Sequence, residues 1–196
     1  MLGRTALESG PAGPSLVPRY RVDTRRSSIG VDLSVNLHPS HLTSNGLRGT
    51  LKCELNRQRQ PRLDAPYSAD LTMPVASLSS GNPLQDVEMR RRLDAGEYPD
   101  ISARVTRAAK PRTAGTYQAT VRFTLHGRTR STRSVATLTV EERGLVIDAE
   151  TTINMKDFGI DPPRLFMLRV EPEVKVGVHI VADEERRPPR SLTSGR

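Results

Sequence analysis

The sequence predicts an all-β protein, an eight-stranded antiparallel barrel with one short helix. Long stretches alternate apolar and polar side chains with the two-residue period of a strand, and about eight of them follow one another along the chain. The links between them are short and polar, and only residues 84–93 break the rhythm. Long strands in near-even number favour a closed up-and-down barrel over a sandwich of short strands.

The chain has 196 residues, enough for one domain with a sizeable core and polar ends. We expect a tail over residues 1–18, a barrel domain over 19–182 and a charged tail over 183–196. The core must be aliphatic, because Trp is absent and there are only 3 Phe and 4 Tyr. No apolar run reaches the roughly 18 residues that span a bilayer, and the N-terminus lacks the apolar segment of a secretory signal. We therefore expect a cytoplasmic protein.

The first half of the chain supplies three strands. Residues 20–23 begin the domain, and residues 29–37 alternate most regularly. Asn45–Gly46 is a tight-turn pair, so we expect it to lie in the hairpin that residues 47–55 complete. A third strand covers residues 69–75, with Pro74 near an edge or bulge because proline cannot donate a ladder hydrogen bond.

Residues 84–93 predict a helix of two to three turns. Asn82 suits the N-cap and Pro83 suits the first turn. Leu84, Val87 and Leu93 share a helical face, and we expect the helix to lie over an end or side of the barrel.

The second half of the chain is again strand-like. Residues 117–125 alternate without a break until Gly127, and the alternation resumes at Ala136, Leu138 and Val140 after a polar basic segment. This pattern indicates a hairpin whose loop is longer than two residues. Further strands are expected at residues 101–105, 145–155 and 170–180.

The net charge is +8, from 30 Lys and Arg against 22 Asp and Glu. Such a field can attract phosphates, anionic lipid or an acidic partner. The arginines are spread over many segments, so we interpret them as a solvated surface and expect no specific nucleic-acid site. Cys53, the only cysteine, excludes an internal disulfide and a multi-cysteine zinc site. It falls in the apolar phase of its strand, which indicates a buried, inert thiol.

No catalytic constellation can be assembled from the sequence. His38 and His41 form a loop pair without cysteines or carboxylates nearby, which favours two solvated side chains over a metal site. We interpret His126 as fixing a turn and Asp157 as organising the loop around Gly159. A nucleophile elbow and a phosphate-binding glycine loop are both missing. We expect no enzyme, no cofactor and no metal.

Four short motifs, in their order and spacing, resemble the YceI-like family of lipocalin-like barrels. The resemblance spans residues 20–182 and implies an extended lumen that takes a long amphiphilic ligand, such as a polyisoprenoid or a fatty-acid-like chain. Many relatives are periplasmic. The chain departs from them at Ser102 and Ala103, where they tend to place an aromatic residue. The motifs are residues 20–23 with Ser28, residues 76–81, residues 97–101 after the helix, and residues 125–130 with 157–160.

The predicted function is to bind and carry or sequester such a molecule in the lumen without catalysis. The alternative is a structural or interaction module whose barrel is filled and whose basic surface meets an acidic partner or nucleic acid. Arg128 and Arg130 are candidates for contact with an anionic head group at the rim. Transient membrane-surface contact and a homodimer are further expectations. The predicted lumen residues are Ile29, Val31, Leu33, Val35, Leu71, Met73, Val121, Phe123, Leu125, Ile147 and Val176.

Overall fold

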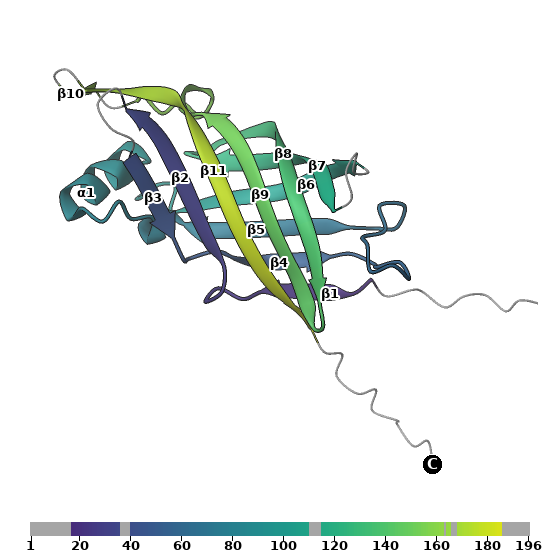
Figure 1. Ribbon diagram of the computed structural model, residues 1–196. Helices are drawn as coiled ribbons and strands as arrows, with labels where there is room; N and C mark the ends of the chain where they lie inside the picture. Colours follow the sequence, from purple (N-terminus) through teal and green to yellow (C-terminus); the bar gives the residue numbers. More distant parts are fainter. Residues whose placement is uncertain (1–16, 36–39, 110–114, 163, 166–167, 186–196) are drawn as a thin grey trace, which may run out of the picture.

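The protein is a closed, eight-stranded antiparallel β-barrel with one α-helix, as predicted (Figure 1). The structure, a computed structural model, describes residues 17–35, 40–109, 115–162, 164–165 and 168–185. Most of both predicted tails lies outside these ranges. The strands are β1 (Arg19–Val22), β2 (Ser28–Val35), β3 (Ser40–Ser44), β4 (Arg48–Lys52), β5 (Ser68–Pro74), β6 (Asp100–Ala109), β7 (Thr116–Leu125), β8 (Arg128–Glu141), β9 (Gly144–Asn154), β10 (Arg164–Leu165) and β11 (Leu168–Glu184); the helices are α1 (Pro83–Arg92) and the 3-10 turns η1 (Val75–Ser77) and η2 (Met155–Phe158).

The barrel closes where β1 joins the two ends of the sheet. Its residue Tyr20 pairs with Leu51 of β4 on one side and with Glu184 of β11 on the other. The remaining strands follow the chain order from β4 through β9 to β11, all antiparallel. Closure leaves few free edges, which is how barrels avoid edge-to-edge association.

β1 and β2 occupy one strand position that is interrupted by residues 23–27. Both segments pair with β11, and the register moves from Val22 opposite Ala182 to Ile29 opposite Val178. Ser27 bridges the interruption: its hydroxyl accepts a hydrogen bond from the Val181 amide (3.0 Å) and donates one to the Val181 carbonyl (3.3 Å). The side chain is almost fully buried, so its hydrogen-bonding groups are satisfied inside the wall.

β3 and β4 share the next position in the same way, and this corrects the prediction for Asn45–Gly46. The pair does not close a hairpin; it separates two strands that run in the same direction. Gly46 is required because a Cβ there would lie 2.4 Å from the Ser77 hydroxyl oxygen. Ser44 and Ser77 hydrogen-bond across this point (2.7 Å).

The β7–β8 hairpin corrects a second prediction, because its turn has only two residues. His126 and Gly127 have φ values of 51° and 67°, the positive pair that a type I′ turn needs. β8 therefore begins at Arg128, and its polar first half pairs residue by residue with β7. Backbone pairing does not require apolar side chains, so the polar stretch looked like a loop in the sequence.

Helix α1 begins where the sequence predicted. The Asn82 side chain accepts hydrogen bonds from the amides of Leu84 (3.0 Å) and Gln85 (3.4 Å), and Pro83 occupies the first turn. The predicted apolar face is wrong for Leu84 and Val87, which are exposed. Its third member, Leu93, packs against the core together with Met89. No helix in the described part of the chain is long and apolar enough to cross a membrane.

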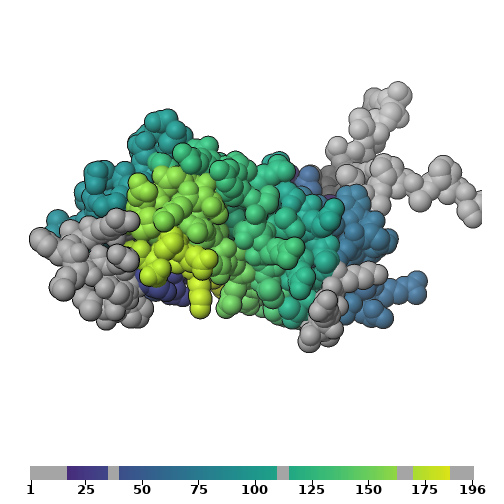
Figure 2. Space-filling view, turned by 90° about the horizontal axis from the view of Figure 1, so that it is seen from above, coloured from purple at the N-terminus to yellow at the C-terminus, as the bar shows by residue number. Residues whose placement is uncertain are grey.

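The main core extends along the barrel as far as Leu78, Met89 and Leu93 at the end beside α1. Its packed layer at the opposite end, which we call the closed end, lies largely beyond the cavity. It is centred on Tyr20, Leu51, Cys53, Leu145 and Ala182, all nearly inaccessible. The loop between β4 and β5 also lies at this end, opposite α1 (Figure 1 and Figure 2). A smaller cluster of Leu125, Phe158 and Ile160 forms towards the other end.

Candidate functional site: an apolar lumen with a polar mouth

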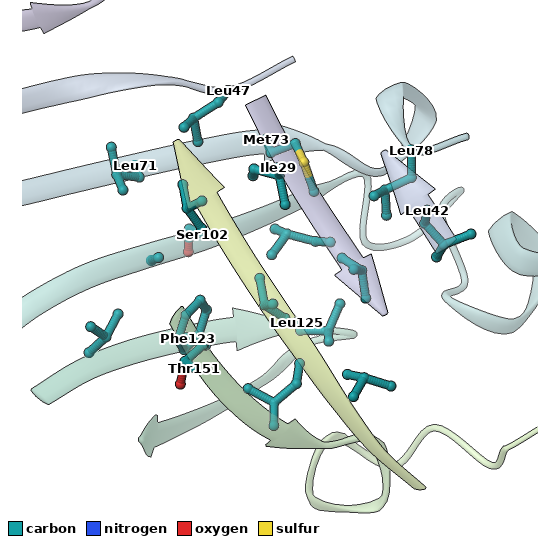
Figure 3. A pocket seen from close by; sticks show the side chains of 18 of the residues that line it. Ile29, Leu42, Leu47, Leu71, Met73, Leu78, Ser102, Phe123, Leu125 and Thr151 are labelled. Carbon is teal, nitrogen blue, oxygen red and sulfur yellow. The ribbon is translucent and has the colours of Figure 1, made fainter. Parts of the chain in front are cut away.

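The barrel encloses a cavity of about 1010 Å³. Side chains from opposite walls converge on it, among them Met73, Phe123 and Leu125 (Figure 3). A volume of this size lies at the upper end of the range for small-molecule sites. The wall is mostly aliphatic, so it offers an apolar ligand contact along much of the barrel.

The cavity exists because small side chains occupy matched positions on three neighbouring strands. Ala119 of β7 pairs with Ser134 of β8, which in turn pairs with Thr151 of β9. Two residues along, Ala136 pairs with Ala149. All five line the cavity. Larger side chains in these rows would fill the lumen, as they do in small barrels with packed interiors.

We call Ala119, Ser134, Ala136, Ala149 and Thr151 the small-residue belt. The hydroxyl groups in this belt do not make the lumen polar. Ser134 donates a hydrogen bond to the Glu150 carbonyl (2.9 Å), and Thr151 donates one to the Arg133 carbonyl (2.9 Å). Both hydroxyl groups are therefore satisfied by the wall itself. An apolar ligand can lie against them without leaving a donor unpaired.

The closed end is dry as well as packed. Burial raises the pKa of the Cys53 thiol to about 11 and that of the Tyr20 hydroxyl to about 12. Desolvation penalises the charged form of each group, which is the expected effect of an apolar surrounding. Neither residue lines the cavity, because both lie in the packed layer beyond it.

The opposite end is the mouth of the cavity, and one face of α1 forms its rim. Gln85, Glu88, Met89 and Arg92 all line it, with the spacing of a single helical face. Glu88 pairs with Arg92 (2.7 Å) and with Arg91 (2.8 Å). The hydrogen bond from Arg91 is the main reason that the pKa of Glu88 is lowered, so this carboxylate stays charged at the rim.

Asp86 fixes α1 at the mouth. Its carboxylate accepts hydrogen bonds from the Ser80 amide (2.7 Å), the Ser80 hydroxyl (2.7 Å) and the Ser79 hydroxyl (2.8 Å). These bonds, the Ser80 amide first, lower the pKa of Asp86, while the charge of Arg90 contributes less. The helix is therefore attached by polar contacts at its first turns, in addition to the packing of Met89 and Leu93.

Ten of the eleven predicted lumen residues line the cavity. The exception is Val35, whose backbone lies in β2 but whose side chain is outside the described part of the structure. The proposed rim residues Arg128 and Arg130 are exposed on β8 and do not line the cavity. The arginine that does so among the described residues is Arg92.

The other polar candidates have structural partners. His41 lies in β3, lines the cavity and pairs with Asp32 (2.6 Å), which corrects the expectation of a loop residue without a carboxylate nearby. Its predicted companion His38 is outside the described residues. His126 shares a hydrogen bond with the Phe158 carbonyl (3.0 Å) and contacts the ring of Tyr98, as its interpretation as a turn residue requires. Within the described ranges no group of three or more His, Cys, Asp or Glu residues could hold a metal ion.

Sequence reasoning missed the small residues of the lumen and the polar residues of the mouth. Ala119, Ala136 and Ala149 carry the apolar phase of their strands, but alanine gives a weak signal of a lumen wall. The available clue was that these small residues lie opposite one another on neighbouring strands, but this can be recognised only when the strand registers are known. Glu88 and Arg92 were not predicted at the mouth, because the sequence pattern pointed to the helical face of Leu84, Val87 and Leu93 instead.

Comparison with known proteins agrees with this architecture. The profile of the YceI-like domain matches residues 20–182. BcnA of Burkholderia cenocepacia is 19% identical with a TM-score of 0.69, covering 82% of this chain and 98% of that one. A polyisoprenoid-binding domain from Saccharophagus degradans, implicated in plant cell wall breakdown, is 12% identical with a TM-score of 0.63, covering 85% and 98%.

The YceI protein of Campylobacter jejuni is 11% identical with a TM-score of 0.60, and the match covers 95% of this chain and 100% of that one. At such identities these structures show a shared fold. No curated protein sequence matches. The family match spans the whole barrel and confirms the resemblance seen in the sequence: the chain belongs to the YceI-like domain family.

Proposed function

We propose that the protein binds one long hydrophobic or amphiphilic molecule, of the polyisoprenoid or fatty-acid class, in its lumen, and carries or sequesters it without chemical change. The observation that carries this proposal is the apolar cavity of about 1010 Å³ inside the barrel. A barrel that served only as a rigid module would be more stable with large side chains in place of Ala119, Ala136 and Ala149.

The energetics favour a chain-like ligand. Each buried CH₂ contributes about 0.8 kcal/mol, so a long alkyl or isoprenoid chain gains several kcal/mol from apolar contact alone. The wall hydroxyls of Ser134 and Thr151 are already bonded to the backbone, so the ligand need not supply a polar partner for them. We therefore expect the lumen to select ligands by the shape and length of their apolar chain.

The polarity of the two ends supports one orientation. The closed end is dry, and a polar head group placed there would lose its hydrogen bonds to water. The mouth offers Gln85, Glu88 and Arg92. We therefore place the apolar tail towards the closed end and the head group beside α1.

Native mass spectrometry of the purified protein, followed by organic extraction, tests the proposal. We expect a stoichiometric long-chain species, or its uptake when the delipidated protein is incubated with polyisoprenoids or fatty acids. An apo mass that stays unchanged with both classes would contradict the proposal.

A matched pair of variants locates the ligand. Ala136→Phe places a ring in the small-residue belt, and Val135→Phe places the same ring on the outer surface of the same strand, where Val135 is 52% exposed. We expect Ala136→Phe to lower affinity at least about tenfold, because the ring takes the volume that the chain needs. Val135→Phe should bind like the wild type; equal loss in both variants would place the ligand elsewhere.

A cavity of about 1010 Å³ does not fit the filled barrel of the alternative, whereas the outer surface supports a second candidate role. Arg104 and Arg122 lie directly opposite each other on β6 and β7, an arrangement that destabilises a sheet unless an anion is near. Asp70 pairs with Arg104. Contact with an acidic partner through this face should weaken at high salt and be lost in Arg122→Ser. Binding of a labelled acidic peptide measures both effects.

A further inference from the structure

The outer face of α1 presents two large apolar side chains to solvent. Leu84 is 82% exposed and Val87 is 61% exposed, and the only other exposed large hydrophobic residue in the described ranges is Val135. Leu84, Val87 and Arg91 follow the i, i+3, i+7 spacing of one helical face. We call these three residues the outer stripe of α1.

The outer stripe is continuous with the lumen. Leu84 lines the cavity although most of its side chain is exposed, so it lies at the lip of the mouth. The neighbouring face of α1 forms the rim, and the helix stands beside β3 at this end of the barrel (Figure 1). Leu84 thus belongs both to the apolar outer surface of α1 and to the lining of the cavity.

Helix α1 itself carries a net charge of +1, from three arginines against Asp86 and Glu88. The last turn of α1 holds three consecutive arginines, Arg90, Arg91 and Arg92. Glu88 faces both Arg91 and Arg92, so one carboxylate is shared by two guanidinium groups. Asp86, the other carboxylate of the helix, accepts hydrogen bonds from two serine hydroxyls and an amide. Arg91 is 69% exposed, and its Nε and Nη2 groups donate to the two oxygens of Glu88, so its remaining N–H groups are the ones that would meet a phosphate.

Exposed apolar groups beside cationic ones are the combination that binds anionic membrane surfaces, since either signal alone gives weak attachment. A protein partner would also cover Leu84 and Val87, but it would gain nothing from the position of Leu84 at the edge of the cavity. A bilayer gains from it directly, because a lipid could move between membrane and lumen without crossing water.

We propose that the outer stripe of α1 docks the protein transiently on an anionic phospholipid membrane, with the mouth of the cavity facing the lipid. The transfer of a ligand at this surface rests on the proposed function; the docking itself does not. Asp86 and its three hydrogen bonds hold the helix in the orientation that brings both faces to the bilayer.

Vesicle flotation tests docking. Vesicles of phosphatidylcholine with one-third phosphatidylglycerol should carry the full chain at low salt and release it at high salt, because the basic residues contribute electrostatically. Val87→Asp places a charge in the stripe without touching the cavity, and Val135→Asp makes the same change on the far surface of β8. We expect Val87→Asp to lower vesicle partitioning at least about tenfold and Val135→Asp to change it less than about twofold.

Transfer of an anthroyloxy-labelled palmitate from protein to vesicles separates the two proposals. With the wild type, the transfer rate should rise with vesicle concentration and with anionic lipid; Val87→Asp should slow it while the solution affinity for the probe stays within about threefold. If the probe does not bind to the protein in solution, the proposed function fails for fatty acids. The flotation experiment would still show whether the protein docks on the membrane.

Three results would overturn the docking proposal. The first is that the wild type does not float with the vesicles at low salt. The second is that Val87→Asp and the wild type float equally. The third is that light scattering shows a wild-type dimer, which Val87→Asp converts to a monomer without a change in flotation. The last result would assign the stripe to a second copy of the chain.

Discussion

The two ends of the barrel are built from the same strands but differ in how the inside is filled. At the closed end, Leu145 is 1% exposed and packs with Tyr20 and Ala182 in a dry core. At the open end the same strands carry Ala136 and Ala149, and a cavity replaces the core. The difference indicates that the interior is filled at the closed end, whereas the interior beyond it stays free to hold a ligand.

The largest expected effect is the loss of a closed-end side chain. Leu145→Ala should lower the free energy of unfolding by about 2–5 kcal/mol, because a tightly packed site cannot collapse around the new void. Leu71→Ala, a control on the lumen wall, should cost about half of that or less, because Leu71 already borders the cavity. Urea unfolding measures both; equal losses would contradict the division into two ends.

Ligand addition should reverse part of this asymmetry. At a free concentration of 100 times the Kd, a lumen ligand should stabilise the protein by about 2.7 kcal/mol, since it binds only the folded barrel. Thermal unfolding with and without the extracted lipid measures the shift. Ala136→Phe should show little of it, whereas Val135→Phe should match the wild type; the same shift in Ala136→Phe would mean that the ligand does not fill the belt.

Most of the strands were predictable from the sequence, because one buried and one wet face impose the two-residue period. The start of β8 was not, since Arg128 to Arg133 are paired through the backbone and stay in water on much of their surface. Closure through β1 was also hidden. The pairing of Tyr20 with Glu184 joins distant parts of the chain, and no local pattern reports it.

The site was predictable in outline only. The large apolar residues of the lumen predict an inward-facing wall, but they do not indicate whether the interior of the barrel is filled or hollow. The cavity depends on the register that places Ala136 opposite Ala149 and Ser134 opposite Thr151. The orientation of α1 likewise depends on the polar contacts of Asp86 and on the packing of Met89 and Leu93, and it leaves Leu84 and Val87 exposed.

The turn at the open end should be worth less than the closed-end core. Gly127→Ala should cost about 1–2 kcal/mol, because a residue with a Cβ is strained at a φ of 67°. A Cβ would also lie 2.6 Å from the ring of Tyr98, which must shift. Gly127→Asn is the control, since asparagine tolerates this backbone conformation; an equal loss in both would assign the cost to the contact with Tyr98. Urea unfolding measures the difference.

The smallest expected effect is on the reactivity of Cys53, and it tests whether the closed end excludes water. With a pKa of about 11, about one thiol in a thousand is ionised at pH 8, and the side chain is buried. Iodoacetamide should therefore label the native protein slowly and the urea-unfolded protein fully. Leu145→Ala should speed native labelling because it loosens the same core, whereas Leu71→Ala should not. Rapid labelling of the native wild type would mean that water reaches the closed end, and the lumen would then be a channel rather than a pocket with one mouth.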